Sequence, residues 1–257
     1  MSQSFTSHLA MTTFCWLPPD MFLTVWLIDG VLMRSVSTYS LEVARAIVGA
    51  DRSTAGTVEL NGRPVQVANP AEAAKLRIGY LSEDRKRYGL LLEQEVNADV
   101  GLSSLHELFQ SFGFMKDKAI RAKSREYVDA LRIKTPSIAQ TAKNLSGGNQ
   151  QKVVIAKWLV KDCDILIFDE PTRGIDVGAK EEIYRLLNDL AQQGKSIIMI
   201  SSELPEVLRM SHRIVVMSEG RVTGILPAAQ ASEESVMHYA TLRSHNAPTV
   251  EPRAGQP

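Results

Sequence analysis

Ser146, Gly147 and Gly148 are the first residues whose types and spacing could do chemistry, because they directly precede a predicted helix over residues 149–160. Ser146 can cap the start of that helix. The two glycines let backbone N–H groups approach an anion closely, and the helix dipole favours negative charge there. The same residues would suit an ordinary capped helix after a Gly-Gly turn. The full motif LSGGNQQ over residues 145–151 favours the binding of a phosphate group instead.

Asp169 and Glu170 are the second such group, and they follow the apolar run ILIF at residues 165–168. A parallel strand that ends in carboxylates places them at the ligand-binding edge of its sheet. Asp169 suits holding Mg²⁺, usually through water, and Glu170 suits orienting and deprotonating an attacking water. Two adjacent acids could also mark a strand that ends in solvent. The residues that follow, PTRGID at 171–176, favour the catalytic interpretation.

The composition is that of an ordinary globular protein of 257 residues, with 44% hydrophobic and 23% charged residues. Lys plus Arg and Asp plus Glu both number 29, and this zero net charge argues against a dedicated nucleic-acid binder. No segment is predicted to span a membrane, since the most apolar stretch, residues 14–33, contains two prolines and two aspartates. Cys163 precedes an apolar strand, which favours a buried free thiol and a reducing compartment.

The elements that must position these groups alternate between helix and strand after residue 145, which predicts an α/β fold with a parallel sheet covered on both faces. Upstream, Asn61-Gly62 predicts a hairpin turn, and residues 91–145 are predicted to be largely helical. We expect helices over residues 41–48, 71–75, 117–131, 149–160, 179–192, 205–210 and 232–242, and strands over residues 21–28, 57–60, 63–67, 78–81, 165–168, 196–200, 214–217 and 222–225.

The two chemical motifs resemble the signature motif and the Walker B motif of ABC-transporter ATPases, with Asp176 at the position of the aspartate loop. Four stretches resemble more narrowly the second, C-terminal cassette of ribose-, xylose- and galactose-type sugar importers: YLSEDRK at 80–86, NQQK at 149–152, RGIDVGAK at 173–180 and SSELPE at 201–206. The resemblance covers residues 42–241. It implies a P-loop NTPase-like ABC cassette with a mostly parallel sheet, a small antiparallel β part and a helical subdomain at about residues 91–145.

The resemblance also implies roles for individual residues, with ATP and Mg²⁺ as cofactors. Glu170 and the switch residue Ser202, where most cassettes have His, would be catalytic. Asp169 and Glu83 would serve the metal, with Glu83 standing where most cassettes have Gln. The nucleotide-binding residues implied are Ser146, Gly147, Gly148, Asn149, Gln150, Glu83 and Asp176.

The partners implied by the resemblance are a second ABC cassette, in a homo- or heterodimer, and the membrane subunits of a sugar permease. A periplasmic sugar-binding protein would take part indirectly, and no nucleic acid is implied. In such a pair each ATP lies between the Walker motifs of one cassette and the signature motif of the other. The chain would then be cytoplasmic and peripheral on the inner face of the cell membrane.

One departure from the family pattern is the lack of a Walker A loop near the start of the cassette. With the chain aligned on Glu42, the basic position falls on Ser40, the next on Leu41, and the loop glycines on Arg34 and Tyr39. The GKS at residues 194–196 precedes a strand, so it is interpreted as a helix C-cap and turn. We therefore expect an incomplete N-terminal part, an impaired nucleotide site and no ATPase activity of the isolated chain.

The expected domain organisation is an atypical segment over residues 1–40, an ABC nucleotide-binding domain over residues 41–244 and a disordered tail over residues 245–257. Two alternatives stay open: a non-catalytic partner that supplies the signature motif in trans, and a truncated or frame-shifted remnant. The second is motivated by residues 1–40, which hold two of the three Trp and no Lys or Glu. A repair or translation factor of the same family is disfavoured by the sugar-type motifs and the zero net charge.

Overall fold

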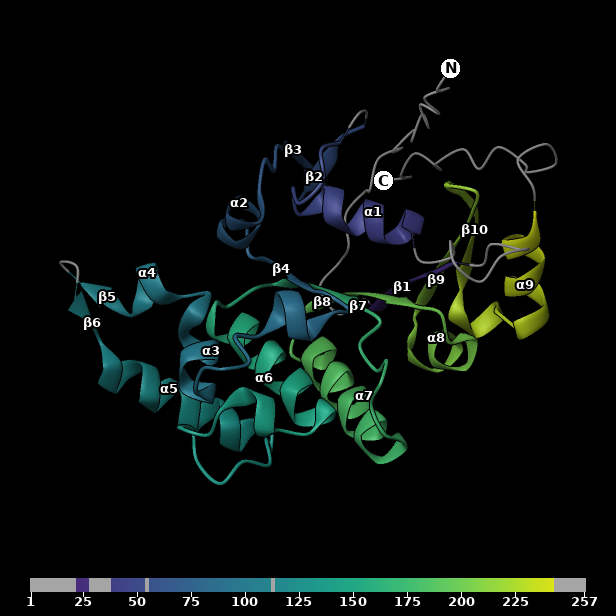
Figure 1. Cartoon of the computed structure of the whole chain (residues 1–257). Coiled ribbons are helices and arrows are strands. Elements are labelled where there is room, and N and C mark those ends of the chain that lie inside the picture. The colour runs from purple at the N-terminus through teal and green to yellow at the C-terminus, as the bar shows by residue number, and fades with distance from the viewer. Residues whose placement is uncertain (1–21, 28–37, 54–55, 112–113, 243–257) are drawn as a thin grey trace, which may run out of the picture. The chain divides into compact units, whose positions relative to one another are not determined.

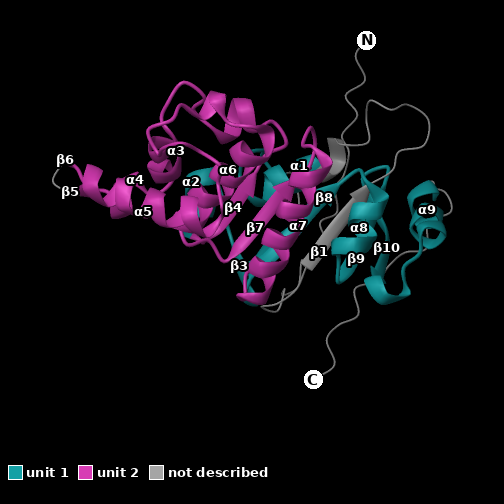
Figure 2. Cartoon of the chain, turned by 90° about the horizontal axis from the view of Figure 1, so that it is seen from below, with its two compact units in different colours: residues 1–75, 196–257 teal, residues 76–195 magenta. Residues whose placement is uncertain are grey.

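A computed structural model describes residues 22–27, 38–53, 56–111 and 114–242. The chain forms two compact units (Figures 1 and 2): unit 1 comprises Met1–Lys75 and Ser196–Pro257, and unit 2 comprises Leu76–Lys195. The expectations for Arg34 and for the tail over residues 245–257 lie outside the described residues, and of the atypical segment over residues 1–40 only residues 22–27 and 38–40 are described. The predicted fold class is confirmed, because both units combine helices with parallel strands.

Four strands of unit 1 are neighbours in the order β10-β9-β1-β8. Strand β1 pairs in parallel with both β8 and β9, and β10 pairs antiparallel with β9. The strands are β1 (Phe22–Leu27), β8 (Ser196–Ser201), β9 (Arg213–Ser218) and β10 (Arg221–Pro227). The apolar run predicted over residues 21–28 therefore does form a strand, with parallel neighbours on both sides.

Helices and a small hairpin complete unit 1. The hairpin turn is confirmed, since Asn61 and Gly62 both have positive φ, 52° and 71°. A core of fully buried residues lies between α8, β9 and α9, formed by Val207, Ile214, Val216, Val236 and Ala240. The elements are α1 (Thr38–Ile47), β2 (Val58–Leu60), β3 (Arg63–Val65), α2 (Pro70–Lys75), α8 (Leu204–Met210), η3 (Ala228–Gln230) and α9 (Glu233–Thr241).

Unit 2 is built on two parallel strands, β4 (Ile78–Leu81) and β7 (Ile165–Asp169). Their register pairs Leu81 with Phe168, so the residues that follow each strand emerge at the same edge. The long helices α6 (Gly147–Val160) and α7 (Val177–Gln192) flank β7 in the sequence. Strand β7 is buried from Leu166 onward, and this burial explains why its apolar run is continuous rather than alternating.

Residues 91–145 are largely helical, as predicted, but they also contain a small hairpin whose two strands have two residues each. A separate helical subdomain stays a prediction, because these helices belong to unit 2 together with β4 and β7. The elements are α3 (Val96–Leu102), α4 (Leu105–Leu108), β5 (Gln110–Ser111), β6 (Phe114–Met115), α5 (Asp117–Ala130) and η2 (Ala142–Asn144).

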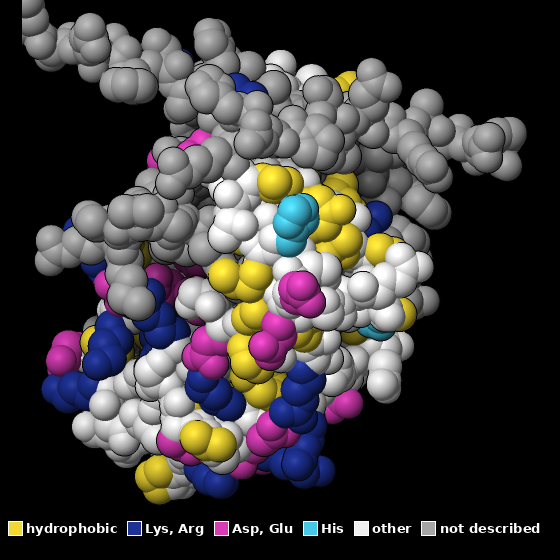
Figure 3. Space-filling model, turned by 90° about the vertical axis from the view of Figure 1, so that its right-hand side faces the viewer, with side chains coloured by type: hydrophobic (Ala, Val, Ile, Leu, Met, Phe, Trp, Pro, Cys, Tyr) yellow, Lys and Arg dark blue, Asp and Glu magenta, His cyan; other side chains and the backbone are white. Residues whose placement is uncertain are grey.

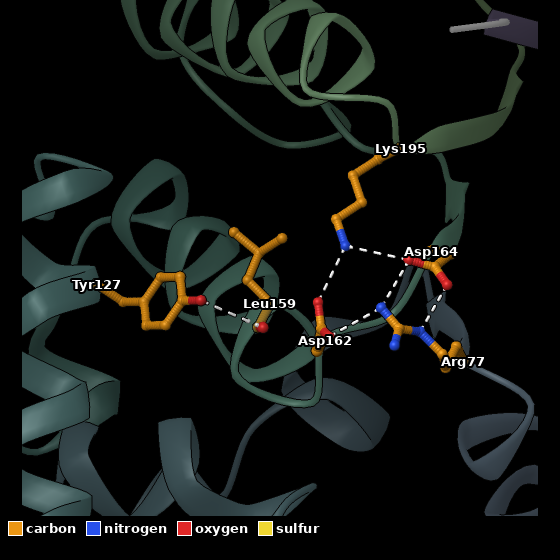
Figure 4. A network of polar contacts seen from close by, with 6 residues as sticks. All are labelled: Arg77, Tyr127, Leu159, Asp162, Asp164 and Lys195. Atoms are coloured by element: carbon orange, nitrogen blue, oxygen red, sulfur yellow. Dashed lines mark hydrogen bonds and ion pairs between the residues drawn. The ribbon is translucent and has the colours of Figure 1, made fainter. Parts of the chain in front are cut away.

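The turns that enter β7 and β8 are joined by an ion-pair network in unit 2 (Figure 4). Arg77 contacts Asp162 at 2.8 Å and Asp164 at 2.5 Å, and Lys195 contacts the same two carboxylates at 3.2 and 3.4 Å. Lys195 also closes α7, because its N–H donates to the carbonyl of Leu190. The predicted C-cap and turn at residues 194–196 is thus confirmed.

The buried cysteine and the distribution of surface charge can both be compared with what the sequence predicted. Cys163 is a free, fully buried cysteine, and burial raises the pKa of its thiol to about 12, so the predicted buried thiol is confirmed. On the face shown in Figure 3, Lys and Arg side chains lie among Asp and Glu side chains, in keeping with the zero net charge. Among the described residues, no helix has the length and apolarity needed to cross a membrane.

Candidate functional site

Asp169 lies at the end of β7, where the edge of the parallel pair meets the loop after β4. Its side chain is 3% exposed, and Oδ2 accepts hydrogen bonds from the Tyr80 hydroxyl at 3.0 Å and from the Glu83 N–H at 3.4 Å. Burial raises the pKa of Asp169, the two hydrogen bonds lower it, and the charge of Glu83 raises it again. Sequence reasoning anticipated that Glu83 and Asp169 belong together, and the structure places them in contact.

The donor chemistry around Asp169 fits a divalent cation. Carboxylate oxygens are the ligands that Mg²⁺ prefers. The charge of Glu83 raises the pKa of Asp169, and the charge of Arg173, which pairs with Glu83 at 2.5 Å, lowers it. The described residues contain no group of three or more His, Cys, Asp or Glu side chains suited to a metal. A Mg²⁺ at this edge would therefore need phosphate and water oxygens as further ligands, which is its usual coordination in phosphate-handling enzymes.

Glu170 follows Asp169 in a strained backbone conformation. Its φ is +48°, in the left-handed region that a residue with a Cβ rarely adopts, and the residue is only 8% exposed. Such strain costs about 1–3 kcal/mol and is concentrated at functional sites. The structure therefore supports the prediction that Glu170 is more than the exposed end of a strand.

The loop at residues 146–150, which we call the signature loop, begins helix α6. Ser146 is the N-cap with an extended backbone, but its side chain makes no capping hydrogen bond, so the expected Ser146 cap is not formed. Its Oγ instead accepts a hydrogen bond from Nδ2 of Asn149 at 2.8 Å, because the Asn149 side chain turns back over the start of the helix. The Oδ1 of Asn149 is held by the N–H of Lys134 at 2.8 Å. The first amides of α6 thus donate no hydrogen bond to the Ser146 side chain and remain suited to an anion.

The two glycines of this loop are required for close packing. A methyl carbon built on Gly148 would lie 2.7 Å from Cβ of Ala179, which brings α6 and α7 together. A methyl carbon on Gly147 would lie 2.8 Å from Nη2 of Arg85 and 3.3 Å from the carbonyl oxygen of Gly174. The glycines therefore have a packing role beside the one expected for anion binding.

Gln150 and Asp176, also predicted to bind nucleotide, are both engaged in internal hydrogen bonds. Gln150 is 4% exposed, and its Nε2 donates to the carbonyl of Ala142 at 3.2 Å. Asp176 caps helix α7, because its Oδ1 accepts from the N–H of Ala179 at 2.9 Å. These contacts fix the backbone on either side of the Gly148–Ala179 contact.

Three consecutive basic residues, Arg85, Lys86 and Arg87, follow Asp84, and such a charged loop is expected to lie in solvent. Lys86 and Arg87 are exposed, but Arg85 is half-buried, so the expectation is wrong for Arg85. Residues Arg85–Gly89 form a single π-helical turn, η1, with the N–H of Leu90 bonded to the Arg85 carbonyl at 2.9 Å. This turn directs the guanidinium inward, half-buried against Gly147. The only sequence signal was the Gly147-Gly148 pair, which indicates that something approaches that backbone closely.

Ser202 directly follows β8 and belongs to unit 1, so it is described with that unit. It is exposed, while the neighbouring Ser201 is buried. The hydroxyl of Ser201 contacts the buried carboxylate of Glu206 and accepts from the N–H of Glu203 at 3.1 Å. The structure thus holds Ser202 at the carboxyl end of a parallel strand, which is the position expected for a residue that serves a ligand.

Comparison with known proteins shows one family match. Residues 42–173, about half of the chain, match the family described as ABC transporter. The chain is 59% identical over 202 residues to the putative ribose/galactose/methyl galactoside import ATP-binding protein 2 of Burkholderia cenocepacia (strain HI2424). It is 56% identical over 209 residues to a putative ribose/galactose/methyl galactoside import ATP-binding protein of Albidiferax ferrireducens. These matches cover 79% and 81% of this chain but only 40% and 42% of the relatives.

Solved structures support the fold. An ATP-binding cassette solved as a dimer with ADP and Pi matches with a TM-score of 0.66 at 22% identity, covering 82% of this chain and 86% of that one. A protein from Clostridium perfringens, part of the ABC transporter complex cbiONQ, matches with a TM-score of 0.67 at 22% identity, covering 88% and 85%. At this identity the likeness concerns the fold alone.

Proposed function

Because the chain belongs to the ABC transporter family, we propose that it is an ATP-binding component of a carbohydrate importer and acts as one of two paired cassettes. The observation that carries this proposal is the signature loop, in which the first amides of α6 lie beside Ser146 without a side-chain cap. The names of the Burkholderia and Albidiferax relatives, which refer to ribose, galactose and methyl galactoside import, support a role in the import of sugars of this type.

The signature loop would act on an ATP held by the partner cassette. Ser146 offers a hydroxyl whose oxygen is oriented by Asn149, and the start of α6 offers amides and the positive end of the helix dipole. Gly147 and Gly148 leave the backbone uncovered for the approach of a phosphate. Asp176 holds the adjacent loop through its cap on α7.

The carboxylates of the chain would act on its own nucleotide. Asp169 and Glu83 would hold Mg²⁺, which supplies charge neutralisation to phosphate oxygens when it is bound. Glu170 would orient a water and accept its proton, and Ser202 would contribute a hydroxyl at the switch position. We propose that this site is impaired, because the loop-glycine positions hold Arg34 and Tyr39 and the basic position holds Ser40.

The partners that follow are a second cassette, the membrane subunits of a sugar permease and, indirectly, a periplasmic sugar-binding protein. Association with the permease would hold the chain at the inner face of the cell membrane.

A narrower function is favoured by the same departure at residues 34–41. The chain would be a non-catalytic partner that supplies the signature loop and does not hydrolyse ATP itself. The two forms of the proposal differ in the role of Glu170 and agree on the role of Ser146.

A complementation assay tests both forms. The probe is a purified ABC cassette that keeps its phosphate-binding loop but whose own signature serine is replaced, so that it depends on a signature loop in trans. We expect the chain to stimulate its ATPase and Ser146→Arg to abolish the stimulation. Ser232→Arg is the matched control, since it places the same charge at the N-cap of α9 in unit 1.

Two further measurements separate the forms. Glu170→Gln is expected to leave the stimulation unchanged if the chain only supplies the signature loop. Binding of Mg-ATP to the isolated chain, followed by calorimetry, is expected to be weak. Tight binding that Asp169→Ala abolishes would show instead that the chain's own site is intact.

A further inference from the structure

We propose that Arg85 is a positioning residue that clamps the signature loop to the segment after β7, so that the two move as one. The inference rests on the proposed function, because the clamp matters for activity only if the signature loop serves an ATP. The clamp itself lies entirely within unit 2 and can be measured without a partner.

The guanidinium of Arg85 contacts both segments at once. Its Nη1 donates to the carbonyl oxygen of Arg173 at 3.3 Å. Its Nη2 lies against Gly147, so close that a methyl carbon there would be 2.8 Å away. The carbonyl oxygen of Gly174 is also near, 3.3 Å from the position that a methyl carbon on Gly147 would take. One planar group thus bridges the first residue of α6 and the loop before α7.

The same loop also reaches the metal edge. The N–H of Glu83 donates to Asp169, and the Glu83 carboxylate forms an ion pair with Nη1 of Arg173 at 2.5 Å. Arg85, two residues later, holds the carbonyl of that same Arg173. A continuous path of polar contacts therefore leads from Asp169 to the guanidinium of Arg85, which lies against Gly147.

Hydrogen bonds alone do not explain why the Arg85 side chain is half-buried. Its Nε is buried and has no hydrogen-bond partner among the residues that the structure describes, and burial lowers the pKa of the guanidinium. An unpaired buried donor is unfavourable for folding, so an apolar side chain would serve stability alone at least as well. The planar, forked shape of arginine is what allows simultaneous contact with a carbonyl and a glycine backbone. Lys86 and Arg87 in the same turn are exposed and serve as internal contrasts.

Hydrogen exchange on the purified chain tests the clamp directly. Three amides report on the two segments: Gln150 is bonded to Ser146, Arg173 to Glu170 and Ile175 to Thr172. We expect Arg85→Ala to accelerate exchange in peptides that carry these amides by about 10-fold, because the local opening they need becomes easier. Lys86→Ala is expected to leave them unchanged. Unchanged exchange in Arg85→Ala would overturn the proposal.

A double-mutant cycle shows whether Arg85 acts through Gly147. Gly147→Ala mainly displaces the flexible end of the Arg85 side chain, and the carbonyl of Gly174, at 3.3 Å from the added methyl, has to give only slightly. The protein is therefore expected to fold and to show the same local acceleration. The double variant is expected to show no more acceleration than either single variant, since both remove one contact. Additive acceleration would mean that the two residues act independently, and the clamp would be wrong.

Stimulation of the signature-deficient cassette described above gives the functional readout. We expect Arg85→Ala to lower the kcat of the stimulated reaction about 10-fold with KM for ATP nearly unchanged, and Arg85→Lys to recover part of it. If the unaltered chain stimulates and Arg85→Ala does so equally well, the inference fails and the proposed function stands. If the unaltered chain gives no stimulation, the proposed function fails, and hydrogen exchange alone decides whether the clamp exists.

Discussion

Asp99 and Lys157 show how single buried charges hold the loop that carries Arg85. The carboxylate of Asp99, on α3, accepts from the N–H of Leu91 at 2.7 Å, and Nζ of Lys157, on α6, donates to the carbonyl of Gly89 at 2.5 Å. The two side chains are 0% and 6% exposed. They therefore fasten the end of η1 to two helices. Oδ2 of Asp99 is nevertheless buried without a hydrogen-bond partner.

Asp99 is expected to make the stability of the chain depend on pH. Burial raises its pKa from 3.8 to about 6, so the folded protein binds more protons than the unfolded chain between these two values. Its contribution to stability is therefore complete below about pH 4 and is lost as the pH rises through 6, by up to roughly 3 kcal/mol. Asp99→Asn cannot titrate. We expect the free energy of unfolding of this variant, relative to the unaltered chain, to rise between pH 4 and pH 7.

Urea unfolding at a series of pH values measures this difference. Asp129→Asn is the matched control, because it removes one carboxylate from an exposed position on α5. A parallel pH dependence for Asp99→Asn and the unaltered chain would contradict the assignment of a raised pKa to Asp99.

At the residue scale, the sequence was informative where a motif combines with a regular element. The Gly-Gly pair predicted the position of Ser146 at the start of α6, and the apolar run over residues 165–168 predicted the position of Asp169 at the end of β7. Arg85 could not be found in that way. Its acceptor, the carbonyl of Arg173, lies 88 residues further along the chain, and a π-helical turn has no periodic pattern that predicts it.

A close contact and an ion pair hold helices α6 and α7 together. Gly148 faces Ala179, and Nζ of Lys152, which is 5% exposed, pairs with Glu182 at 2.7 Å. This contact sets the distance between the signature loop and the loop capped by Asp176. The relative position of the two loops is thus a property of helix packing rather than of the loops themselves.

Gly148→Ala is expected to destabilise unit 2 by about 1–3 kcal/mol, because the added methyl would lie 2.7 Å from Cβ of Ala179 and force the helices apart. Thermal unfolding measures the change. Gly178→Ala is the matched control on α7, where the nearest atom is 3.4 Å from the added methyl, and it is expected to be neutral or stabilising by up to about 1 kcal/mol. Ala179→Gly should restore part of the stability lost in Gly148→Ala. Equal effects of Gly148→Ala and Gly178→Ala would argue against a close contact.

At the element scale, most helices and strands lie where periodicity and turn residues predicted them. The hairpin of β5 and β6 was missed because each strand has only two residues, too few to show an alternating pattern. The missing side-chain cap of Ser146 has a similar cause. The Ser146 hydroxyl could accept a hydrogen bond either from a backbone N–H of α6 or from the Asn149 side chain. It bonds to Asn149, whose position is fixed by its contact with the N–H of Lys134.

At the scale of the molecule, the α/β class followed from the alternation of apolar strands and helices, but the division into units did not. Unit 1 takes in segments from both ends of the chain, while unit 2 is one continuous stretch. Such a division arises from pairing between distant strands, for instance β1 with β8 and β9, and no local signal in either strand announces it. The residues proposed to act on nucleotide fall in unit 2, with the exception of Ser202.

The two units are expected to respond separately to damage in their cores. In unit 1, a methyl carbon built on Gly224 of β10 would lie 2.6 Å from the ring of Tyr239 on α9, so Gly224→Ala should loosen the packing of α9 over the sheet. Hydrogen exchange should then accelerate in β9, β10 and α9 while α6 and β7 keep their protection, because sub-global opening follows cooperative units. Gly148→Ala is expected to give the reverse pattern. Acceleration across all these elements in both variants would mean that the chain opens as one body, and the signature loop would then share its stability with unit 1.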